Sequence, residues 1–358
     1  MKYEVRKRED GKKAIFDEKG NRVSEWFDGI NTNGLVIGES NLFIAKKGRK
    51  WAIFDENGNR ISEWFDKIYP DGLVKGKSRY YIAKKNNKFA IFDENGNMIS
   101  PEWYDEIYPY GLVNGESDYY IVKRNQMYAI FDKNGNMVSP DWFDRISLEG
   151  LVMGQSSYYR AEKNLKMFVF DAYKNRITPD SFVVVSLCGL VRGESDYYMA
   201  MKGLKLAIFD KDGNQISRWF DGLSPFGLIW GQSNYYIAGI GRNQAIFDKD
   251  GNRISEWFDE IEPDGLVKGE SNYYIAIKKK NRKEAIFDID GNQISEWFDW
   301  IYPYGLVKGQ SDYFIACNNN TCAIYHKDGK KVSDDFSLNI GQIKEITFND
   351  ELGIVEIE

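Results

Sequence analysis

The chain has 358 residues, of which 42% are hydrophobic and 15% aromatic, so it can bury a large core and does not have the composition of a disordered protein. Its formal net charge of −6 offers no basic footprint, and we expect neither DNA nor RNA as a partner. No run of about 18 apolar residues predicts a membrane span, and the first residues lack the apolar stretch of a secretory signal. With only three cysteines, a cytoplasmic location is the default expectation.

One short motif recurs along the chain with a spacing of 38 to 40 residues. It reads Ala-Ile-Phe-Asp or a close variant, and it begins at Ala14, Ala52, Ala90, Ala129, Phe168, Ala207, Ala245, Ala285 and Ala323. A fixed period of this size is the signature of a repeat protein, in which neighbouring repeats share one continuous core. We therefore predict a single β-repeat domain over residues 1–358.

Each repeat is predicted to form four short antiparallel strands, because runs rich in Ile, Val, Phe, Tyr and Trp alternate with turn sequences. In one representative repeat the strands are expected at Leu73–Lys75, Tyr80–Lys85, Phe89–Asp93 and Asn97–Trp103. Gly-x-Ser turns join the first two strands, and Asn-Gly or Asp-Gly turns join the last two. No window shows the period of an amphipathic helix, so we predict an all-β protein.

In chain order, residues 1–33 form a partial repeat without a Gly-Leu-Val start. Further repeats start near residues 34, 72, 111, 150, 189, 227, 265 and 305. The segment 323–358 diverges: it keeps one hairpin, and two later apolar runs stand where the first strands of another repeat belong. We expect this segment to close a ring or cap an array.

Four antiparallel strands in about 40 residues is the design of a β-propeller blade. A chain that begins inside a blade can complete that blade from its other end and leave no exposed edge. We therefore predict a closed propeller of roughly eight or nine blades. An open superhelical β-repeat array is the alternative.

The segment from Trp51 to Val74 resembles the repeat of the bacterial WG-repeat family, which runs Trp-Gly, Ile-Asp, a glycine turn, an apolar strand, Tyr-Asp and Gly-Leu. Here Trp51 is followed by Ala-Ile-Phe-Asp, Gly58 supplies the turn, and Trp-Phe-Asp and Gly72-Leu-Val follow. Alanine stands in place of the family's glycine. The resemblance covers nearly all of the chain. It implies a bacterial origin, a β-repeat architecture and a binding or scaffolding role without a shared active site.

No catalytic or metal-binding set can be assembled from the sequence. The only histidine, His326, has no cysteine or serine partner at a supporting spacing. The Asp-x-Asp-Gly-Asn turns that begin at Asp210, Asp248 and Asp288 offer oxygen ligands, but their spacing is not that of a calcium loop. We expect these aspartates to accept backbone hydrogen bonds across the turn. We therefore expect no enzyme activity, no metal and no cofactor.

Seven tryptophans share one position of the repeat, beside a Phe or Tyr and an Asp: Trp26, Trp64, Trp103, Trp142, Trp219, Trp257 and Trp297. A regular row of this kind could stack sugars, as in a multivalent lectin. A large aromatic side chain more often bridges sheets that cannot bury their faces alone, so we expect these tryptophans in the core between repeats.

The cysteines allow two interpretations. Cys317 and Cys322 flank a tight turn rich in asparagine, which allows a cross-strand disulfide. We expect two half-buried thiols instead, because three cysteines are too few for a disulfide framework.

The fifth repeat departs most from the pattern. Lys174 replaces the turn glycine, Ser181 replaces the tryptophan and Val183 replaces the following aspartate. The run that follows is apolar, and an apolar surface patch often marks an interface. We therefore select Phe182, Val183, Val184, Val185 and Leu187 as candidate contacts with a partner. Compensatory packing around the missing tryptophan is the alternative.

Two tryptophans lie off the repeat. Trp230 and Trp300 stand where other repeats carry mostly polar residues, which predicts exposed positions and makes them candidate anchors for a partner. Surface tryptophans of no function are the alternative.

The acidic turns should share one end of each sheet and the lysine-rich turns the other, a layout that favours oriented docking. We predict a non-enzymatic scaffold that binds a protein. The alternative is a multivalent carbohydrate-binding protein, with a glycan as the ligand.

Overall fold

The structure is a computed structural model, and it describes residues 2–337, 346–349 and 354–357. Those residues form strands and turns, and none of them is helical. The chain divides into two compact units, an N-terminal unit of Met1–Ser181 and a C-terminal unit of Phe182–Glu358. The all-β fold expected from the sequence is confirmed.

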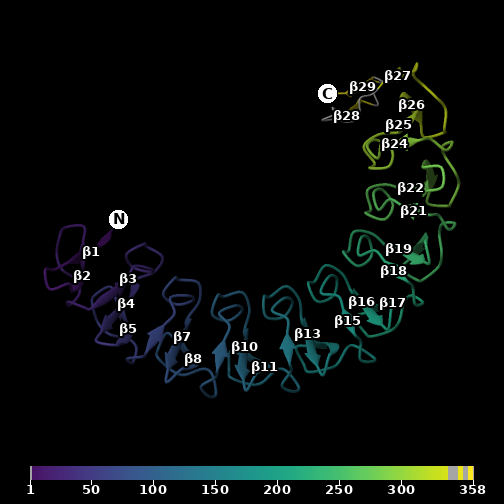
Figure 1. Cartoon of the computed structure of the whole chain (residues 1–358). Helices are drawn as coiled ribbons and strands as arrows, with labels where there is room; N and C mark the ends of the chain where they lie inside the picture. Colours follow the sequence, from purple (N-terminus) through teal and green to yellow (C-terminus); the bar gives the residue numbers. More distant parts are fainter. Residues whose placement is uncertain (1, 338–345, 350–353, 358) are drawn as a thin grey trace. The chain divides into compact units, whose positions relative to one another are not determined.

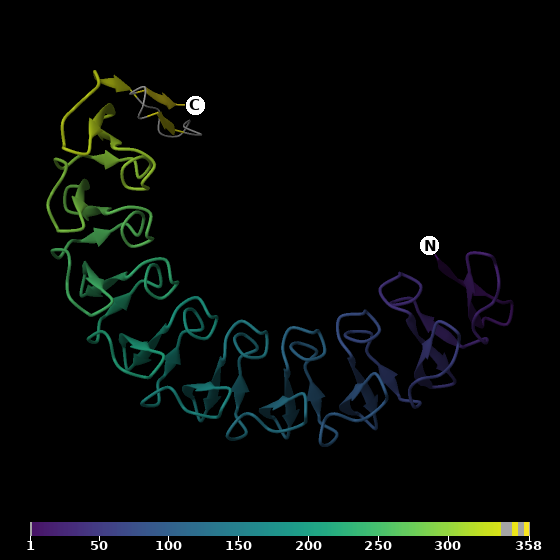
Figure 2. The same ribbon diagram turned by 180° about the vertical axis from the view of Figure 1, so that it is seen from behind.

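Figure 1 labels most of the strands in chain order, and Figure 2 shows the same chain from behind. The N-terminal unit contains β1 (Tyr3–Lys7), β2 (Lys13–Asp17), β3 (Gly29–Asn31), β4 (Leu42–Lys47), β5 (Lys50–Asp55), β6 (Lys67–Ile68), β7 (Tyr80–Lys85), β8 (Lys88–Asp93), β9 (Glu106–Ile107), β10 (Tyr119–Arg124), β11 (Met127–Asp132), β12 (Arg145–Ile146), β13 (Tyr158–Lys163) and β14 (Lys166–Asp171).

The C-terminal unit continues with the same succession of one short and two longer strands. It contains β15 (Val184–Val185), β16 (Tyr197–Lys202), β17 (Lys205–Asp210), β18 (Gly222–Leu223), β19 (Tyr235–Ile240), β20 (Asn243–Asp248), β21 (Glu260–Ile261), β22 (Tyr273–Lys278), β23 (Lys283–Asp288), β24 (Trp300–Ile301), β25 (Tyr313–Asn318), β26 (Thr321–His326), β27 (Phe336–Ser337), β28 (Ile346–Asn349) and β29 (Ile354–Ile357).

Each repeat forms one small antiparallel sheet. In the representative repeat the strand order is β6-β7-β8, and Tyr80 of β7 lies opposite Asp93 of β8. A fourth segment runs along the free edge of β8, where Met98 pairs with Phe92 and Tyr104 with Phe89 in isolated bridges. In the last complete sheet the fourth segment is a strand, β27, beside β26. The four-stranded antiparallel repeat is therefore confirmed.

One expected strand is instead a turn. The Lys75 amide donates to the Pro70 carbonyl and the Lys77 amide to the Gly72 carbonyl, so the segment with the Gly-Leu-Val sequence coils on itself. Gly72 has a φ of +82°, and a Cβ at this position would lie 2.2 Å from the Tyr80 carbonyl oxygen. The prediction of a strand at Leu73–Lys75 is therefore wrong. Leu73 and Val74 are buried, but they lie in a turn, and the first strand of the sheet is β6.

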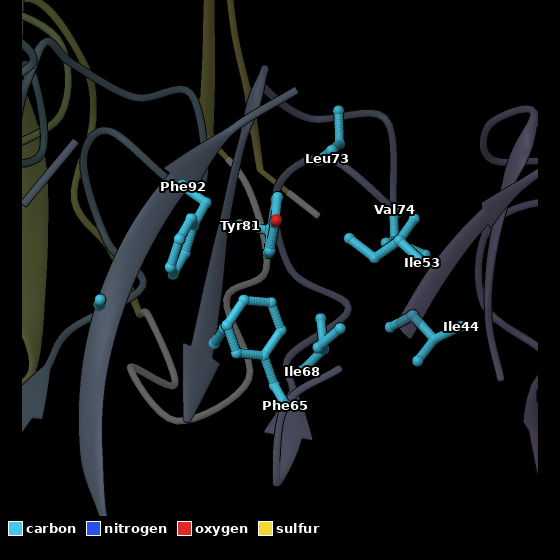
Figure 3. Packing of buried hydrophobic residues seen from close by; sticks show 10 residues of the cluster. Ile44, Ile53, Phe65, Ile68, Leu73, Val74, Tyr81 and Phe92 are labelled. Atoms are coloured by element: carbon cyan, nitrogen blue, oxygen red, sulfur yellow. The ribbon is translucent and has the colours of Figure 1, made fainter. Parts of the chain in front are cut away.

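The core lies between neighbouring sheets. Ile44, Ile53 and Phe65 of one repeat pack in a single cluster with Tyr81 and Phe92 of the next repeat (Figure 3). Because the next repeat covers this face, the sheet does not have to form a core of its own.

A row of serine hydroxyls also joins successive repeats. The Ser78 Oγ donates to the Val113 carbonyl oxygen at 2.7 Å. The same bond from a Gly-x-Ser turn to the next repeat is made by Ser40 to Val74, Ser117 to Val152, Ser195 to Ile229, Ser233 to Val267 and Ser271 to Val307. The regular Gly-x-Ser sequence is therefore part of the contact between repeats as well as a turn.

The repeated tryptophans are half-buried at the edge of this core. Trp103 packs against Phe92, with ring centroids 5.8 Å apart, and against Phe65 of the preceding repeat at 6.3 Å. Trp297 makes the same two contacts, with Phe287 at 6.0 Å and Phe258 at 6.3 Å. The expected position between repeats is confirmed for these side chains.

The two cysteines of the C-terminal segment differ from the sequence prediction. Cys317 and Cys322 lie directly opposite each other in β25 and β26 and form a disulfide. The expectation of two thiols is therefore wrong, because the hairpin register brings the two side chains together. Beyond it, β28 and β29 pair as an antiparallel hairpin, whereas residues 342–345, which belong to the first of the two predicted extra strands, lie outside the described residues. The closed propeller and the open array both stay predictions.

Candidate binding surfaces

In the regular repeats, an aspartate holds the hairpin turn at the lysine-rich end of the sheet. The Asp66 carboxylate accepts a hydrogen bond from Lys50 at 2.6 Å and from the Asn86 amide at 2.8 Å, and these contacts lower the pKa of Asp66. An aspartate accepts the equivalent turn amide in the repeats with Asp28, Asp105, Asp144, Asp221, Asp259 and Asp299. This position of the repeat therefore has a structural use, and its side chain faces the turn.

Val183 occupies the same position in the C-terminal unit. Its amide donates to the Met201 carbonyl, as the Asp66 amide donates to Lys84, so the backbone path is unchanged. The Val183 side chain is 47% exposed, Val184 is 38% exposed, and Leu204 in the adjoining turn is 89% exposed. We call Val183, Val184 and Leu204 the valine patch. It replaces a carboxylate-capped turn with an apolar surface.

The other residues of the selected run do not belong to this surface. Phe182 and Val185 are fully buried, and Phe182 packs against Phe209 with ring centroids 5.2 Å apart. Both keep the buried positions that Phe65 and Ile68 hold in a regular repeat. Leu187 is half-buried. Of the five residues selected from this run, Val183 and Val184 are the two that are exposed.

Trp230 and Trp300 are half-buried rather than exposed. Trp230 packs edge-on against Phe226, with centroids 4.5 Å apart, and its Nε1 is buried with no hydrogen-bond partner among the described residues. Trp300 packs edge-on against Tyr302 at 3.9 Å. Each indole thus packs against an aromatic ring a few residues away along the chain, a pairing that the polar residues at the same position of other repeats did not indicate.

Two clefts between repeats of the N-terminal unit were not predicted. The first, with a volume of about 330 Å³, is lined by Tyr69, Phe89, Ile107 and Pro109 and bordered by Asp71 and Glu106. The second, of about 260 Å³, is lined by the residues at the same repeat positions, Tyr108, Tyr128, Ile146 and Leu148, and is bordered by Arg145. The signal for both was available in the repeat itself, since they are the repeats with an aromatic residue at both the Tyr69 and the Phe89 positions.

The acidic turns have the local role expected of them. Asp55 Oδ1 accepts hydrogen bonds from the amides of Asn57 at 3.0 Å and Asn59 at 2.7 Å. Among the described residues, no three His, Cys, Asp or Glu side chains gather closely enough to hold a metal ion. The part of the chain that the structure describes also contains no helix that could cross a membrane.

Comparison with known proteins yields only distant likenesses. No family model matches the chain, and no curated protein matches it. Among solved structures, it is similar to a eukaryotic initiation factor at 11% identity and a TM-score of 0.34, over 94% of this chain and 96% of the other. It is also similar to Hsv2 from Kluyvelomyces marxianus at 12% identity and 0.28, over 89% and 93%, and to BamB from Moraxella catarrhalis at 13% and 0.26, over 84% and 90%. TM-scores this low carry no argument about function.

Proposed function

We propose that this protein is a non-enzymatic scaffold that binds a partner protein through the valine patch. One observation carries the proposal. Asp66 and its counterparts cap a turn at this repeat position, whereas Val183 and the neighbouring Leu204 leave apolar side chains in water. Exposure of Val and Leu gives the isolated chain no stability, but these side chains gain free energy when a partner covers them.

The rest of the chain is consistent with a scaffold. The aspartates described above are engaged in turn hydrogen bonds that recur from repeat to repeat, so no single carboxylate among them is set apart for catalysis. The resemblance to the bacterial WG-repeat family implies the same kind of role. A series of similar sheets with one irregular surface suits recognition better than chemistry, for which a single asymmetric site is needed.

The test uses a double variant that copies the next repeat. Val183→Asp introduces the residue found at Asp221, and Leu204→Arg introduces the residue found at Arg242. Proteins retained from a lysate of the source organism by the wild-type chain, but not by the variant, are purified and titrated against both. We expect the affinity of such a partner to fall by about tenfold or more, as for the loss of a central apolar contact.

Leu165→Arg is the matched control, because Leu165 is 82% exposed at the same turn position of a repeat that keeps its aspartate, Asp144. Equal retention of partners by the wild-type chain and the double variant would contradict the proposal. Loss of the partner in the Leu165 variant as well would move the interface away from the valine patch.

The carbohydrate alternative receives no support from the repeated tryptophans. Arg124 lies 4.2 Å from the ring centre of Trp142, and Lys278 lies 3.8 Å from that of Trp297. A cation therefore occupies a ring face on which a sugar would have to stack. A glycan-array signal that disappears when several of these tryptophans are changed together would favour the lectin instead.

A further inference from the structure

The two clefts of the N-terminal unit are built from the same repeat positions. Tyr69 and Phe89 line the first, and Tyr108 and Tyr128 line the second. The corresponding pairs elsewhere are Asn31 with Trp51, Ser147 with Met167, Ser186 with Leu206, Ser224 with Gln244, Glu262 with Glu284, and Tyr302 with Cys322. Two successive repeats therefore share a feature that the other complete repeats lack.

The aromatic rings form wedges rather than flat platforms. The planes of Tyr69 and Phe89 are tilted by 41° with centroids 6.0 Å apart, and those of Tyr108 and Tyr128 by 42° at 6.3 Å. Lysine ammonium groups already lie over the first pair, 4.3 Å from the Tyr69 ring centre and 5.2 Å from that of Phe89. A tilted pair offers no flat platform for a sugar ring, but it accepts a compact apolar side chain such as the pyrrolidine of proline.

The distance between the two clefts determines which backbone conformation lets one peptide reach both of them. The sheets of successive repeats pack face to face in a common core, which sets their spacing at about 10 Å. In a polyproline II helix, residues three apart point in the same direction and lie about 9 Å from each other. In a β-strand, residues on one face repeat every ~6.6 Å, so a strand cannot place equivalent side chains in both clefts.

Charged side chains border both clefts. Asp71 and Glu106 border the first cleft, and Arg145 borders the second. Glu106 and Arg145 occupy the same repeat position with opposite charge. Asp71 is ion-paired with Lys75 at 2.8 Å and Glu106 with Lys123 at 3.8 Å, and Lys67 and Lys84 lie over the first pair of rings. The borders therefore favour no single order of charges in the peptide.

We propose that the two clefts bind a proline-rich segment of a protein in the polyproline II conformation, with one proline of a Pro-x-x-Pro sequence in each cleft. This site is separate from the valine patch, so either proposal can fail without the other.

The experiment measures the fluorescence anisotropy of labelled peptides titrated with the full chain. The probes are peptides of about ten residues in which Pro-x-x-Pro is flanked by arginine and glutamate, made in both orders. A peptide of the same composition with the prolines two residues apart is the control. We expect saturable binding of the Pro-x-x-Pro peptides, and binding weaker by about tenfold or more for the altered proline spacing.

The decisive variant is Tyr69→Ser with Phe89→Met, which copies the Ser147 and Met167 pair of a repeat in the same unit and so preserves the fold. It should lower the affinity by about tenfold or more. Leu206→Met, at the Phe89 position of a repeat in the other unit, and Val183→Asp should leave it unchanged.

Equal affinity for both proline spacings, or for the wild-type chain and the double variant, would overturn the proposal. Binding of a glycan that the double variant abolishes, without binding of any peptide, would overturn it in favour of a sugar site. Circular dichroism of the variant confirms that it is folded, so that a loss of binding is assigned to the cleft.

Discussion

Within the C-terminal unit, the repeat around Val183 and the repeat around Asp221 are alike inside and different outside. Phe182 and Phe220 are both buried, and so are Tyr198 and Tyr236. At the surface, the Asp221 carboxylate accepts the Gly241 amide at 2.8 Å, whereas Val183 is 47% exposed beside the corresponding turn. The irregular repeat has kept these buried phenylalanine and tyrosine residues, although Ser181 replaces the repeated tryptophan, and it has changed a residue that meets solvent.

This difference separates two kinds of departure from a repeat. A change at a buried position has to be compensated by its neighbours, because interiors are packed without spare volume. A change at an exposed position is free of that requirement, so it reports on what the surface contacts. The valine patch belongs to the second kind.

The largest expected effect is a loss of stability at high pH, which arises from the buried tyrosines that both repeats share. The hydroxyls of Tyr81, Tyr120, Tyr159, Tyr198, Tyr236 and Tyr274 are buried without a hydrogen-bond partner among the described residues. Burial raises the pKa of Tyr198 and Tyr236 above the ordinary value. An unfolded tyrosine loses its proton near pH 10 whereas the folded one keeps it, so stability is complete below about pH 10 and falls as the pH rises further.

Each of these tyrosines should cost roughly 1.4 kcal/mol of stability per pH unit above about pH 10. Urea unfolding between pH 9 and pH 11 measures the slope. Tyr198→Phe and Tyr236→Phe should each reduce it by the same amount, because Phe43 and Phe314 already occupy this position in other repeats. A different reduction for the two variants would show that the two interiors are not equivalent.

Substitution of a single glycine tests whether both turns before the hairpin are equally constrained. A Cβ at Gly227 or at Gly189 would lie 2.1 Å from the carbonyl oxygen of Tyr235 or Tyr197, and both glycines have φ values near +80°. Gly227→Ala and Gly189→Ala should each cost about 3 kcal/mol or more in the free energy of unfolding by urea.

Gly203→Asn is the control for this pair. Gly203 has a φ of +63°, a Cβ at this position would meet no atom within 4 Å, and asparagine occupies the same turn position at Asn86 and Asn125. This change should cost less than about 0.5 kcal/mol. A mild effect of Gly189→Ala would mean that the irregular repeat is also looser inside.

Those parts of the fold that follow from the pattern of apolar residues and from the length of the repeat could be predicted. The strand expected at Tyr80–Lys85 is β7 with the same bounds, and the one expected at Phe89–Asp93 is β8, which begins one residue earlier at Lys88. Leu73 and Val74 led to the wrong strand because an apolar run shows that residues are buried, but not whether their backbone pairs with another strand.

The binding surfaces were predictable only in part. The apolar run at Val183 was visible, but its division into buried Phe182 and Val185 and exposed Val183 and Val184 required the register of the sheet. The clefts depend on residues 20 positions apart, Tyr69 and Phe89, which become neighbours through the hairpin. A comparison of each repeat position along the chain indicates such pairs, whereas a search for continuous motifs does not.

The smallest expected effect is a change in the urea midpoint when the two surface residues that differ, Asp221 and Val183, are exchanged. Lys205 and the Gly241 amide lower the pKa of Asp221, so its contribution to stability is present above about pH 4 and is lost as the pH falls. Asp221→Val should therefore lower the urea midpoint at pH 7 and have less effect at pH 3. Val183→Asp should maintain or raise the midpoint at pH 7, because the new carboxylate can accept the Gly203 amide. If Val183→Asp instead lowers the midpoint, Val183 contributes to the fold, and its exposure no longer argues for a partner.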